Sequence, residues 1–201
     1  MSDWKDAIAH LSKADPKLVP LIDKHGHPTI NPGRDPVHSL ARAIAGQQLS
    51  TKAADTIFGR FLALYPRQKF PKPEEILATP DEALRGVGLS GAKAAAIKDL
   101  ARHVVEKKFH PKKLPGMDDA AISAALLPIR GIGPWSVDMF LMFSLARPDV
   151  LPVGDLGVRK GMQIHFKLRS LPEAAKMHKL AAPWAPFRSI GSWYMWRLLE
   201  S

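Results

Sequence analysis

Two glycines, together with the helix that follows them, form a candidate anion-binding site. They lie in the segment 127–161, LPIRGIGPWSVDMFLMFSLARPDVLPVGDLGVRKG. Gly131 and Gly133 bracket Ile132 in a short turn, and Pro134 suits the first position of a helix, where its missing N–H costs nothing. A glycine turn that opens a helix directs backbone N–H groups outward, so it can bind an anion such as a phosphate.

Asp155 is the carboxylate that the same segment positions. Residues 134–146 contain only three polar side chains, which predicts a mostly buried helix. Pro148 ends that helix and Pro152 keeps the returning chain extended or turned, so Asp155 arrives at the start of the next helix. By residue type alone Asp155 is most simply an N-cap, which accepts backbone N–H groups of the following turn. A fixed carboxylate can also stabilise positive charge that develops in a reaction, and both roles can hold at once.

Composition narrows the classes of partner. The 201 residues are enough for one domain, or for two closely packed lobes, with a sizeable core. The 29 Lys and Arg against 19 Asp and Glu give a net charge of +10, which favours a polyanionic partner and nucleic acid above all. No apolar run of about 18 residues and no signal-peptide pattern occurs, so we expect no membrane partner. The absence of cysteine excludes disulfides, thiolate metal centres and a cysteine-ligated iron–sulfur cluster.

The remaining chain is typical of helices joined by Pro- and Gly-rich loops, without the alternation of strands. Helices are predicted at 2–11, 15–26, 37–46, 51–65 with Ser50 as N-cap, 74–77, 81–84, 134–146, 156–166, 172–181 and 190–199. The stretch RGVGLSGAKAAAI at 85–97 parallels RGIGPWSVDMFLM at 130–142, which predicts a second hairpin and a helix ending near Glu106. A plain Gly-rich connection is the alternative. The segment 107–114 is a basic loop, either solvated or in contact with DNA.

Three stretches resemble the helix-hairpin-helix DNA glycosylase superfamily, and most of all its alkylation-repair branch, the 3-methyladenine DNA glycosylase II type. They are GQQLSTKAA at 46–54, the segment 127–161 and WAPFRSIGSWYMW at 184–196. A bare GxG hairpin is a weak signal. The hairpin followed at this distance by PVGDLGVRKG is a strong one, and with the spacing between the stretches the resemblance covers nearly the whole chain.

The resemblance implies an all-α fold of two helical lobes with an active-site cleft between them. Lobe one would comprise about 1–34 plus 150–201, and lobe two about 35–149, with the Pro/Gly-rich segment 27–36 as the crossing. The last helix would pair with the N-terminal helices, and the cleft would hold Asp155 and Trp135. We expect a monomer that acts inside the cell with the DNA, in the cytoplasm if the source is prokaryotic.

The resemblance also places the essential aspartate at Asp155. Removal of a base from deoxyribose builds positive charge on the sugar, and a carboxylate beneath it can stabilise that charge and orient or deprotonate the attacking water. Asp138 and Asp149 are rivals by residue type, but neither matches the motif. Relatives that also cut the strand have a lysine where this chain has Trp135, and Lys160 does not match that position. A monofunctional glycosylase that uses water is therefore expected.

Aromatic side chains are expected in the base pocket, because an enzyme that acts on a flipped-out base must hold it by stacking. Trp135 matches an aromatic position of the branch, and an indole face also attracts a positively charged alkylated purine. A tryptophan there could equally be a core residue. Met139 matches a position that can be aromatic in the branch. Trp184 and Phe187 are candidates for the far wall, with plain packing as the alternative.

A wedge that fills the gap left by the flipped base is implied at Gln48 or Leu49. The alternative for the Gln47–Gln48 pair is a buried pair of amides that satisfies loop backbone. Hairpins of the family often hold a monovalent cation on backbone carbonyls, which here would be those of Leu127, Ile129 and Ile132; no other cofactor is expected. Contacts to the DNA backbone are expected from hairpin amides and nearby polar side chains, namely Gly131, Gly133, Trp135, Ser50, Lys52 and Lys93.

The expected function is therefore excision of alkylated bases, such as 3-methyladenine and 7-methylguanine, from double-stranded DNA in base excision repair. Two other classes stay open. A non-catalytic helix-hairpin-helix module would share the hairpins and the basic charge without needing Asp155 or Trp135. A glycosylase for another lesion class, such as deaminated purines, would share the motif.

Overall fold

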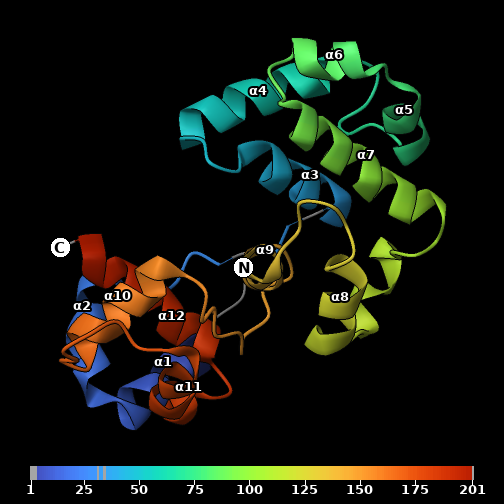
Figure 1. The fold of residues 1–201 in the computed structure, drawn as a ribbon. Helices are drawn as coiled ribbons and strands as arrows, with labels where there is room; N and C mark the ends of the chain where they lie inside the picture. The colour runs from blue at the N-terminus through green and yellow to red at the C-terminus, as the bar shows by residue number, and fades with distance from the viewer. Residues whose placement is uncertain (1–3, 31, 34, 201) are drawn as a thin grey trace. The chain divides into compact units, whose positions relative to one another are not determined.

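The computed structural model describes residues 4–30, 32–33 and 35–200. Every regular element in those ranges is a helix (Figure 1), which confirms the all-α prediction. The chain divides into two compact units: unit 1 is Met1–Pro32 with Asp138–Ser201, and unit 2 is Gly33–Val137. The second boundary lies at 137/138 and not at 149/150; near the end of the added segment, Arg147 and Asp149 are hydrogen-bonded to Ser189 and Arg188 of unit 1.

Unit 1 combines N-terminal with C-terminal helices, as the family resemblance implies (Figure 1). Its main helices are α1 (Lys5–Ala14), α2 (Val19–His25), α10 (Leu156–His165), α11 (Ala174–Ala181) and α12 (Arg188–Arg197). The Tyr194 hydroxyl of α12 donates to the Gly26 carbonyl, which closes α2, at 2.9 Å. Asp15 is a buried carboxylate that accepts the Trp184 indole N–H at 3.0 Å and bonds His165 at 2.7 Å. Residues 150 or more positions apart therefore share one core.

Helices α10 and α12 approach each other closely because α10 carries glycine at two positions one turn apart. A Cβ on Gly161 would lie 2.4 Å from the Met195 carbonyl oxygen, and a Cβ on Gly157 would lie 2.7 Å from Cδ1 of Trp196. A Cβ on Gly161 would require the backbone of α12 to move, and a Cβ on Gly157 would displace the Trp196 indole. The PVGDLGVRKG motif therefore contains the residues that let α12 pack against the start of α10.

Unit 2 is built around α7, which packs against α3 and α5. Its helices are α3 (Pro36–Gly46), α4 (Thr51–Ala63), α5 (Pro73–Ala78), α6 (Asp81–Gly86), α7 (Gly91–Val105) and α8 (Asp119–Leu126). The rings of Phe58 and Phe61 stack in the core at a centroid distance of 5.7 Å. Asp35 caps α3, and Ser50 caps α4 as predicted, through a hydrogen bond from the Ala53 N–H at 3.3 Å. Side-chain caps are the local reason that these helices begin where they do.

The helix predicted at 134–146 has a different form in the structure. α9 covers Pro134–Met139 only, and a π-helical turn follows at Phe140–Ser144. The Leu145 N–H donates to the Phe140 carbonyl at 3.1 Å, five residues back, so the chain winds more widely before it leaves the helix.

Other differences are confined to element ends and to one region. The first helix is described from Lys5, and the start predicted at residue 2 lies outside the described residues. In the basic segment 107–114 the lysines are exposed, whereas Phe109 and Leu114 are buried and anchor the segment in the core. Helix α8 has no counterpart among the helices predicted from the sequence. Among the described residues no helix is long and apolar enough to cross a membrane.

Candidate active site

The predicted glycine hairpin joins α8 to α9 in unit 2. Gly131 adopts φ +79°, and a Cβ there would lie 3.1 Å from Cβ of Ala96, so the turn requires glycine. The Arg130 N–H donates to the Asp99 carboxylate of α7 at 2.9 Å. The Gln47 side-chain amide donates to the Gly131 carbonyl at 2.7 Å. The hairpin is therefore fixed both to α7 and to the turn that follows α3.

The second hairpin, predicted from the repeated Arg-Gly-aliphatic-Gly pattern, is also present. Gly88 adopts φ +103° and lies against Ile57, whose Cγ1 would be 3.1 Å from a Cβ on the glycine. The Ser90 hydroxyl accepts the Lys93 backbone N–H at 3.3 Å and caps α7. Both hairpins of unit 2 thus lead directly into helices.

The turn between α3 and α4 exposes the two residues expected to form the wedge. Gln48 has φ +58°, a left-handed conformation that few residues other than glycine adopt. Leu49 is 39% exposed, which is unusual for a large apolar side chain. The alternative of a buried amide pair that satisfies loop backbone holds only in part: neither amide residue is buried, but the Gln47 amide does donate to a backbone carbonyl of the hairpin.

The candidate phosphate-binding side chains separate into two groups. Lys52 is exposed in the first turn of α4, next to the capping residue Ser50. Lys93 is different: its ammonium group donates to the carbonyls of Ala45 at 3.0 Å and Gln47 at 2.6 Å. Burial lowers the pKa of Lys93 below its ordinary value. Lys93 is therefore committed to the C-terminal end of α3, and we do not retain it as a phosphate contact.

Trp135 lies in the first turn of α9, directly after the hairpin, and is 47% exposed. The alternative of a core tryptophan does not fit this exposure. Met139, four residues later on the same helix, is half-buried.

The three carbonyls implied as cation ligands lie in the hairpin. The Ile129 carbonyl accepts the Ile132 N–H at 3.1 Å, so it also takes part in the turn itself. Carbonyl oxygens are ligands that suit a hard cation. No group of three or more His, Cys, Asp or Glu side chains in the described residues could hold a metal ion.

Asp155, in unit 1, is 9% exposed and begins α10. Its Oδ1 accepts the Val158 backbone N–H at 2.8 Å, which confirms the predicted N-cap. The same oxygen accepts the Trp196 indole N–H from α12 at 2.8 Å. A capping role alone does not require the second donor, so Asp155 is held more firmly than an ordinary N-cap.

The two rival aspartates have distinct environments. Burial and, second, the charge of Asp155 raise the pKa of Asp138 to about 6. Burial alone would raise the pKa of Asp149, but hydrogen bonds and charge from Arg188 offset it and lower the pKa. Asp138 is thus electrostatically coupled to Asp155, whereas Asp149 is the partner of an arginine.

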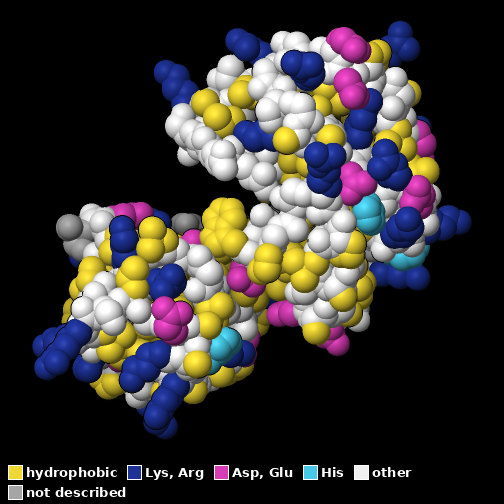
Figure 2. Space-filling model, in the orientation of Figure 1, with side chains coloured by type: hydrophobic (Ala, Val, Ile, Leu, Met, Phe, Trp, Pro, Cys, Tyr) yellow, Lys and Arg dark blue, Asp and Glu magenta, His cyan; other side chains and the backbone are white. Residues whose placement is uncertain are grey.

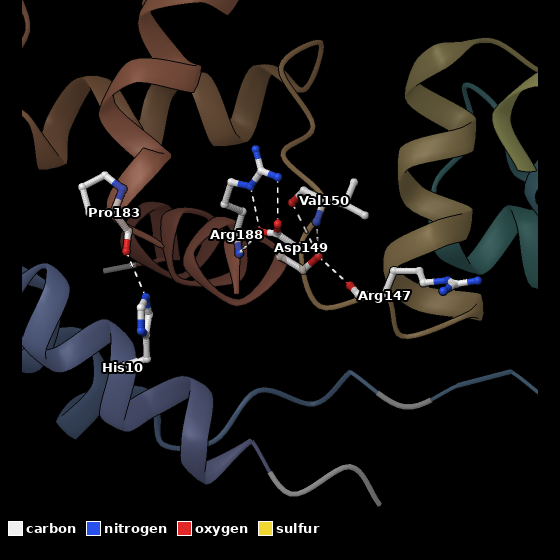
Figure 3. A network of polar contacts seen from close by, with 7 residues as sticks. His10, Arg147, Asp149, Val150, Pro183 and Arg188 are labelled. Atoms are coloured by element: carbon white, nitrogen blue, oxygen red, sulfur yellow. Dashed lines mark hydrogen bonds and ion pairs between the residues drawn. The ribbon is translucent and has the colours of Figure 1, made fainter. Parts of the chain in front are cut away.

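Figure 3 shows how the pair formed by Asp149 and Arg188 anchors the chain that leads to Asp155. The Arg188 guanidinium donates to both carboxylate oxygens of Asp149, at 2.7 and 2.8 Å. The Ser189 hydroxyl accepts the Val150 N–H at 2.9 Å and donates to the Arg147 carbonyl at 2.6 Å. The segment before Asp155 is therefore fastened to the start of α12, which explains Asp149 as a structural residue.

Two of the aromatic residues expected in the pocket are accounted for by packing in unit 1. Trp184 is fully buried, with its indole N–H bonded to Asp15, so it is a core residue and we do not retain it in the base pocket. Phe187 is half-buried, packs against the core and meets the His10 ring edge-on at a centroid distance of 5.5 Å. The His10 ring is itself bonded to the Pro183 carbonyl at 2.9 Å (Figure 3).

An aromatic pair that was not predicted from the sequence lies next to Asp155. Trp196 donates to Asp155, and the rings of Trp196 and Phe143 lie 5.7 Å apart. Phe143 is 39% exposed. The only signal in the sequence was that Trp196 ends one of the three matching stretches, which contains two other tryptophans.

The chain is similar to known proteins of one family. Residues 41–186 match the HhH-GPD superfamily of base excision DNA repair proteins. The chain is 34% identical over 195 residues to DNA-3-methyladenine glycosylase 1 of Schizosaccharomyces pombe, covering 95% of this chain and 86% of that protein. The solved structure of the S. pombe enzyme, Mag1, in complex with abasic DNA matches with a TM-score of 0.84 and 96% coverage of both chains. A DNA-3-methyladenine glycosidase from Bacillus halodurans matches at 32% identity and a TM-score of 0.84, covering 95% of this chain and 88% of that one.

Proposed function

This chain belongs to the HhH-GPD superfamily of base excision DNA repair proteins, and we propose that it is a monofunctional DNA glycosylase for alkylated bases. The observation that carries the proposal is the placement of Asp155, a buried carboxylate held by both the Val158 N–H and the Trp196 indole N–H. The names of the relatives, DNA-3-methyladenine glycosylases, support alkylated purines as the substrate class.

In the proposed reaction the glycosidic bond between C1′ and the base breaks, and a water oxygen bonds to C1′. The carboxylate of Asp155 stabilises the oxocarbenium-like sugar and orients or deprotonates the water, whose proton is released as the base departs. The position after the hairpin and its proline carries Trp135, so no lysine is present there to attack the sugar. The product is an intact abasic site.

Aromatic side chains recognise the flipped base in this proposal. The exposed indole of Trp135 would stack on the base and attract the positive charge of a 3- or 7-alkylated purine. Trp196, which is bonded to Asp155, and its neighbour Phe143 are additional candidates for contact with the nucleotide. The half-buried Met139 would contribute an adaptable apolar contact.

Engagement of double-stranded DNA relies on charge and on the α3–α4 turn. Figure 2 shows Lys and Arg side chains spread over the face in view, consistent with the net charge of +10. Gln48 or Leu49 would fill the gap in the duplex. Phosphates would be bound by Ser50, Lys52 and the amides of Gly131, Gly133 and Trp135. We propose that the protein acts as a monomer, in the cellular compartment that contains the DNA.

The carbonyls of Leu127, Ile129 and Ile132 would hold a monovalent cation. Such an ion would add positive charge at the hairpin, where a phosphate is expected to bind. The turn is also stabilised by the protein alone, through the left-handed conformation of Gly131 and the hydrogen bonds of the hairpin to Asp99 and Gln47.

A panel of duplexes, each with one defined lesion, tests the proposal. Release of 3-methyladenine or 7-methylguanine, with strands that remain uncut until alkali is added, is expected. Base release with strand cleavage and borohydride trapping of the enzyme would indicate a lyase. Salt-dependent DNA binding without release of any base would indicate a binding module. Preferential release of deaminated purines would indicate another lesion class.

A further inference from the structure

The turn between α3 and α4, which carries Gln48 and Leu49, is only weakly stabilised by its own backbone hydrogen bonds. Gln48 is left-handed at φ +58°, which costs an L-residue about 1–2 kcal/mol. The turn's own backbone bonds are those from the Gln47 N–H to the Ile44 carbonyl at 3.4 Å and from the Leu49 N–H to the Gly46 carbonyl at 3.1 Å. Both are longer than the usual backbone hydrogen bond of about 2.9–3.0 Å. Stronger contacts must come from outside the turn.

Those contacts come from α7 and from the hairpin that contains Gly131. From α7, which follows the second hairpin, the Lys93 ammonium reaches the carbonyls of Ala45 and Gln47 at 3.0 and 2.6 Å. From the first hairpin, the Gly131 carbonyl accepts the Gln47 side-chain amide at 2.7 Å. Charge-assisted bonds such as those of Lys93 are about twice as strong as neutral ones. The ammonium also lies at the C-terminal end of α3, where a positive charge is favoured by the helix dipole.

We propose that Lys93, assisted by Gln47, is a positioning residue that preorganises the Gln48–Leu49 wedge for insertion into duplex DNA. The proposal deepens the proposed function and rests on it, since it concerns the same turn. A wedge already held in its inserted shape loses little conformational freedom when it enters the gap left by a flipped base. Lys93 therefore acts through the Gln48–Leu49 wedge and not by touching DNA.

Lys93→Met, which keeps the side-chain length but removes the donors, is the direct test. The same lesion is presented in a duplex and in a single strand, and excision is measured in single turnovers, with enzyme in excess over the DNA but below saturation. We expect a loss of about 10- to 100-fold on the duplex, the loss typical of a hydrogen bond to a charged group. On the single strand, which leaves no gap to plug, the change should be less than about twofold. Equal losses on both substrates would overturn the proposal.

A double-mutant comparison shows whether Lys93 acts through the wedge. In a Gln48→Ala/Leu49→Ala background both wedge side chains are absent, so Lys93→Met should change the duplex rate by less than about twofold. If the two effects multiply, Lys93 acts elsewhere and the proposal is wrong. Lys52→Met is the matched control: this exposed lysine lies in the first turn of α4, and its loss should weaken binding to both substrates and reduce the salt dependence.

A second variant and a second measurement keep the proposal testable if Lys93→Met fails to fold. Gln47→Met removes only the tie to the Gly131 carbonyl, a neutral hydrogen bond, so about a fivefold loss confined to the duplex is expected. Insertion is also read without base release, from the fluorescence of 2-aminopurine beside a tetrahydrofuran abasic analogue, with Asp155→Asn protein. Lys93→Met in that protein should reduce the rise in fluorescence at saturating protein; an unchanged rise would overturn the proposal. If instead the proposed function is wrong, the unmutated protein will release no base from any lesion, which distinguishes that outcome from a failure of the Lys93 proposal.

Discussion

The Trp196 indole N–H donates a hydrogen bond of 2.8 Å to Oδ1 of Asp155, the same oxygen that accepts the Val158 N–H. This contact joins the start of α10 to the end of α12, 41 residues away in the chain. It is possible because Gly157, next to the indole, has no side chain to keep it away. The carboxylate proposed to stabilise the sugar cation is therefore oriented by the tertiary structure as well as by its own helix.

Asp155→Asn should abolish base release while leaving the fold intact. Loss of one preorganised electrostatic partner costs about 2.7–4 kcal/mol, or about 10²–10³ in rate, and loss of a full charge should cost at least that. Asparagine is also a good N-cap, so the melting temperature should hardly change. Single-turnover excision and thermal melting are the measurements. An Asn variant with normal activity would show that Asp155 is only a cap and would direct attention to Asp138.

Trp196→Phe should slow excision by about 10- to 100-fold, because it removes a donor to a charged group while retaining an aromatic ring. Single-turnover rates at saturating enzyme separate this effect from DNA binding. Trp193→Phe is the matched control, since Trp193 is a buried tryptophan of α12 that packs on Tyr194 and Arg197. It should lower stability without this loss of rate. Equal rate losses in the two variants would indicate a general packing defect.

Asp138→Asn should stabilise the protein at neutral pH. The folded-state pKa of Asp138 is raised from 3.8 to about 6, so the cost of ionising this carboxyl in the folded protein grows between about pH 4 and pH 6, is complete above pH 6 and is small at pH 4. We expect a gain of about 1 kcal/mol at pH 7.5, less than the full pKa shift implies because the side chain is partly solvated. Urea unfolding at pH 7.5 and pH 4 measures the difference, with the exposed Asp23→Asn as control. A gain that is the same at both pH values would contradict this assignment.

Trp135→Ala should affect cationic lesions more than neutral ones. A cation–π contact contributes about 0.5–2 kcal/mol, so excision of 7-methylguanine should fall about 2- to 30-fold further than excision of hypoxanthine. Trp135→Phe retains a ring and should recover part of the difference. Equal losses on both lesions would leave stacking, without recognition of charge, as the role of Trp135.

Gly161→Ala should destabilise unit 1 and slow catalysis together. The new Cβ would lie 2.4 Å from the Met195 carbonyl oxygen, so α12 must shift, at a cost of about 1–3 kcal/mol. The shift would also move Trp196 relative to Asp155. Gly154→Ala in the preceding loop is the control, because a Cβ there meets no atom within 4 Å and should change stability by less than about 0.5 kcal/mol. A Gly161→Ala protein as stable as the control would mean that the close approach is relieved without strain.

Features set by neighbouring residues were predictable from the sequence. Gly131 and Gly88 marked the two hairpins because the turns require a backbone conformation that glycine adopts without strain. Ser50 and Asp155 were predicted as N-caps because a side-chain oxygen two or three residues before an amide can accept its hydrogen bond. The all-α class followed from the spacing of apolar residues. Each of these signals acts within a few positions of the chain.

Features set by helix packing were decided only by the tertiary structure. Trp196 rather than Trp184 bonds Asp155, although both belong to one matching stretch of sequence, because the faces of α10 and α12 that meet determine which indole reaches the carboxylate. Lys93 is of a residue type that binds phosphate, but its ammonium bonds the carbonyls of Ala45 and Gln47 at the C-terminal end of α3. These residues are 46 to 48 positions away in the chain. Residue type limits what a side chain can bond, whereas the partners across such distances depend on how the helices pack.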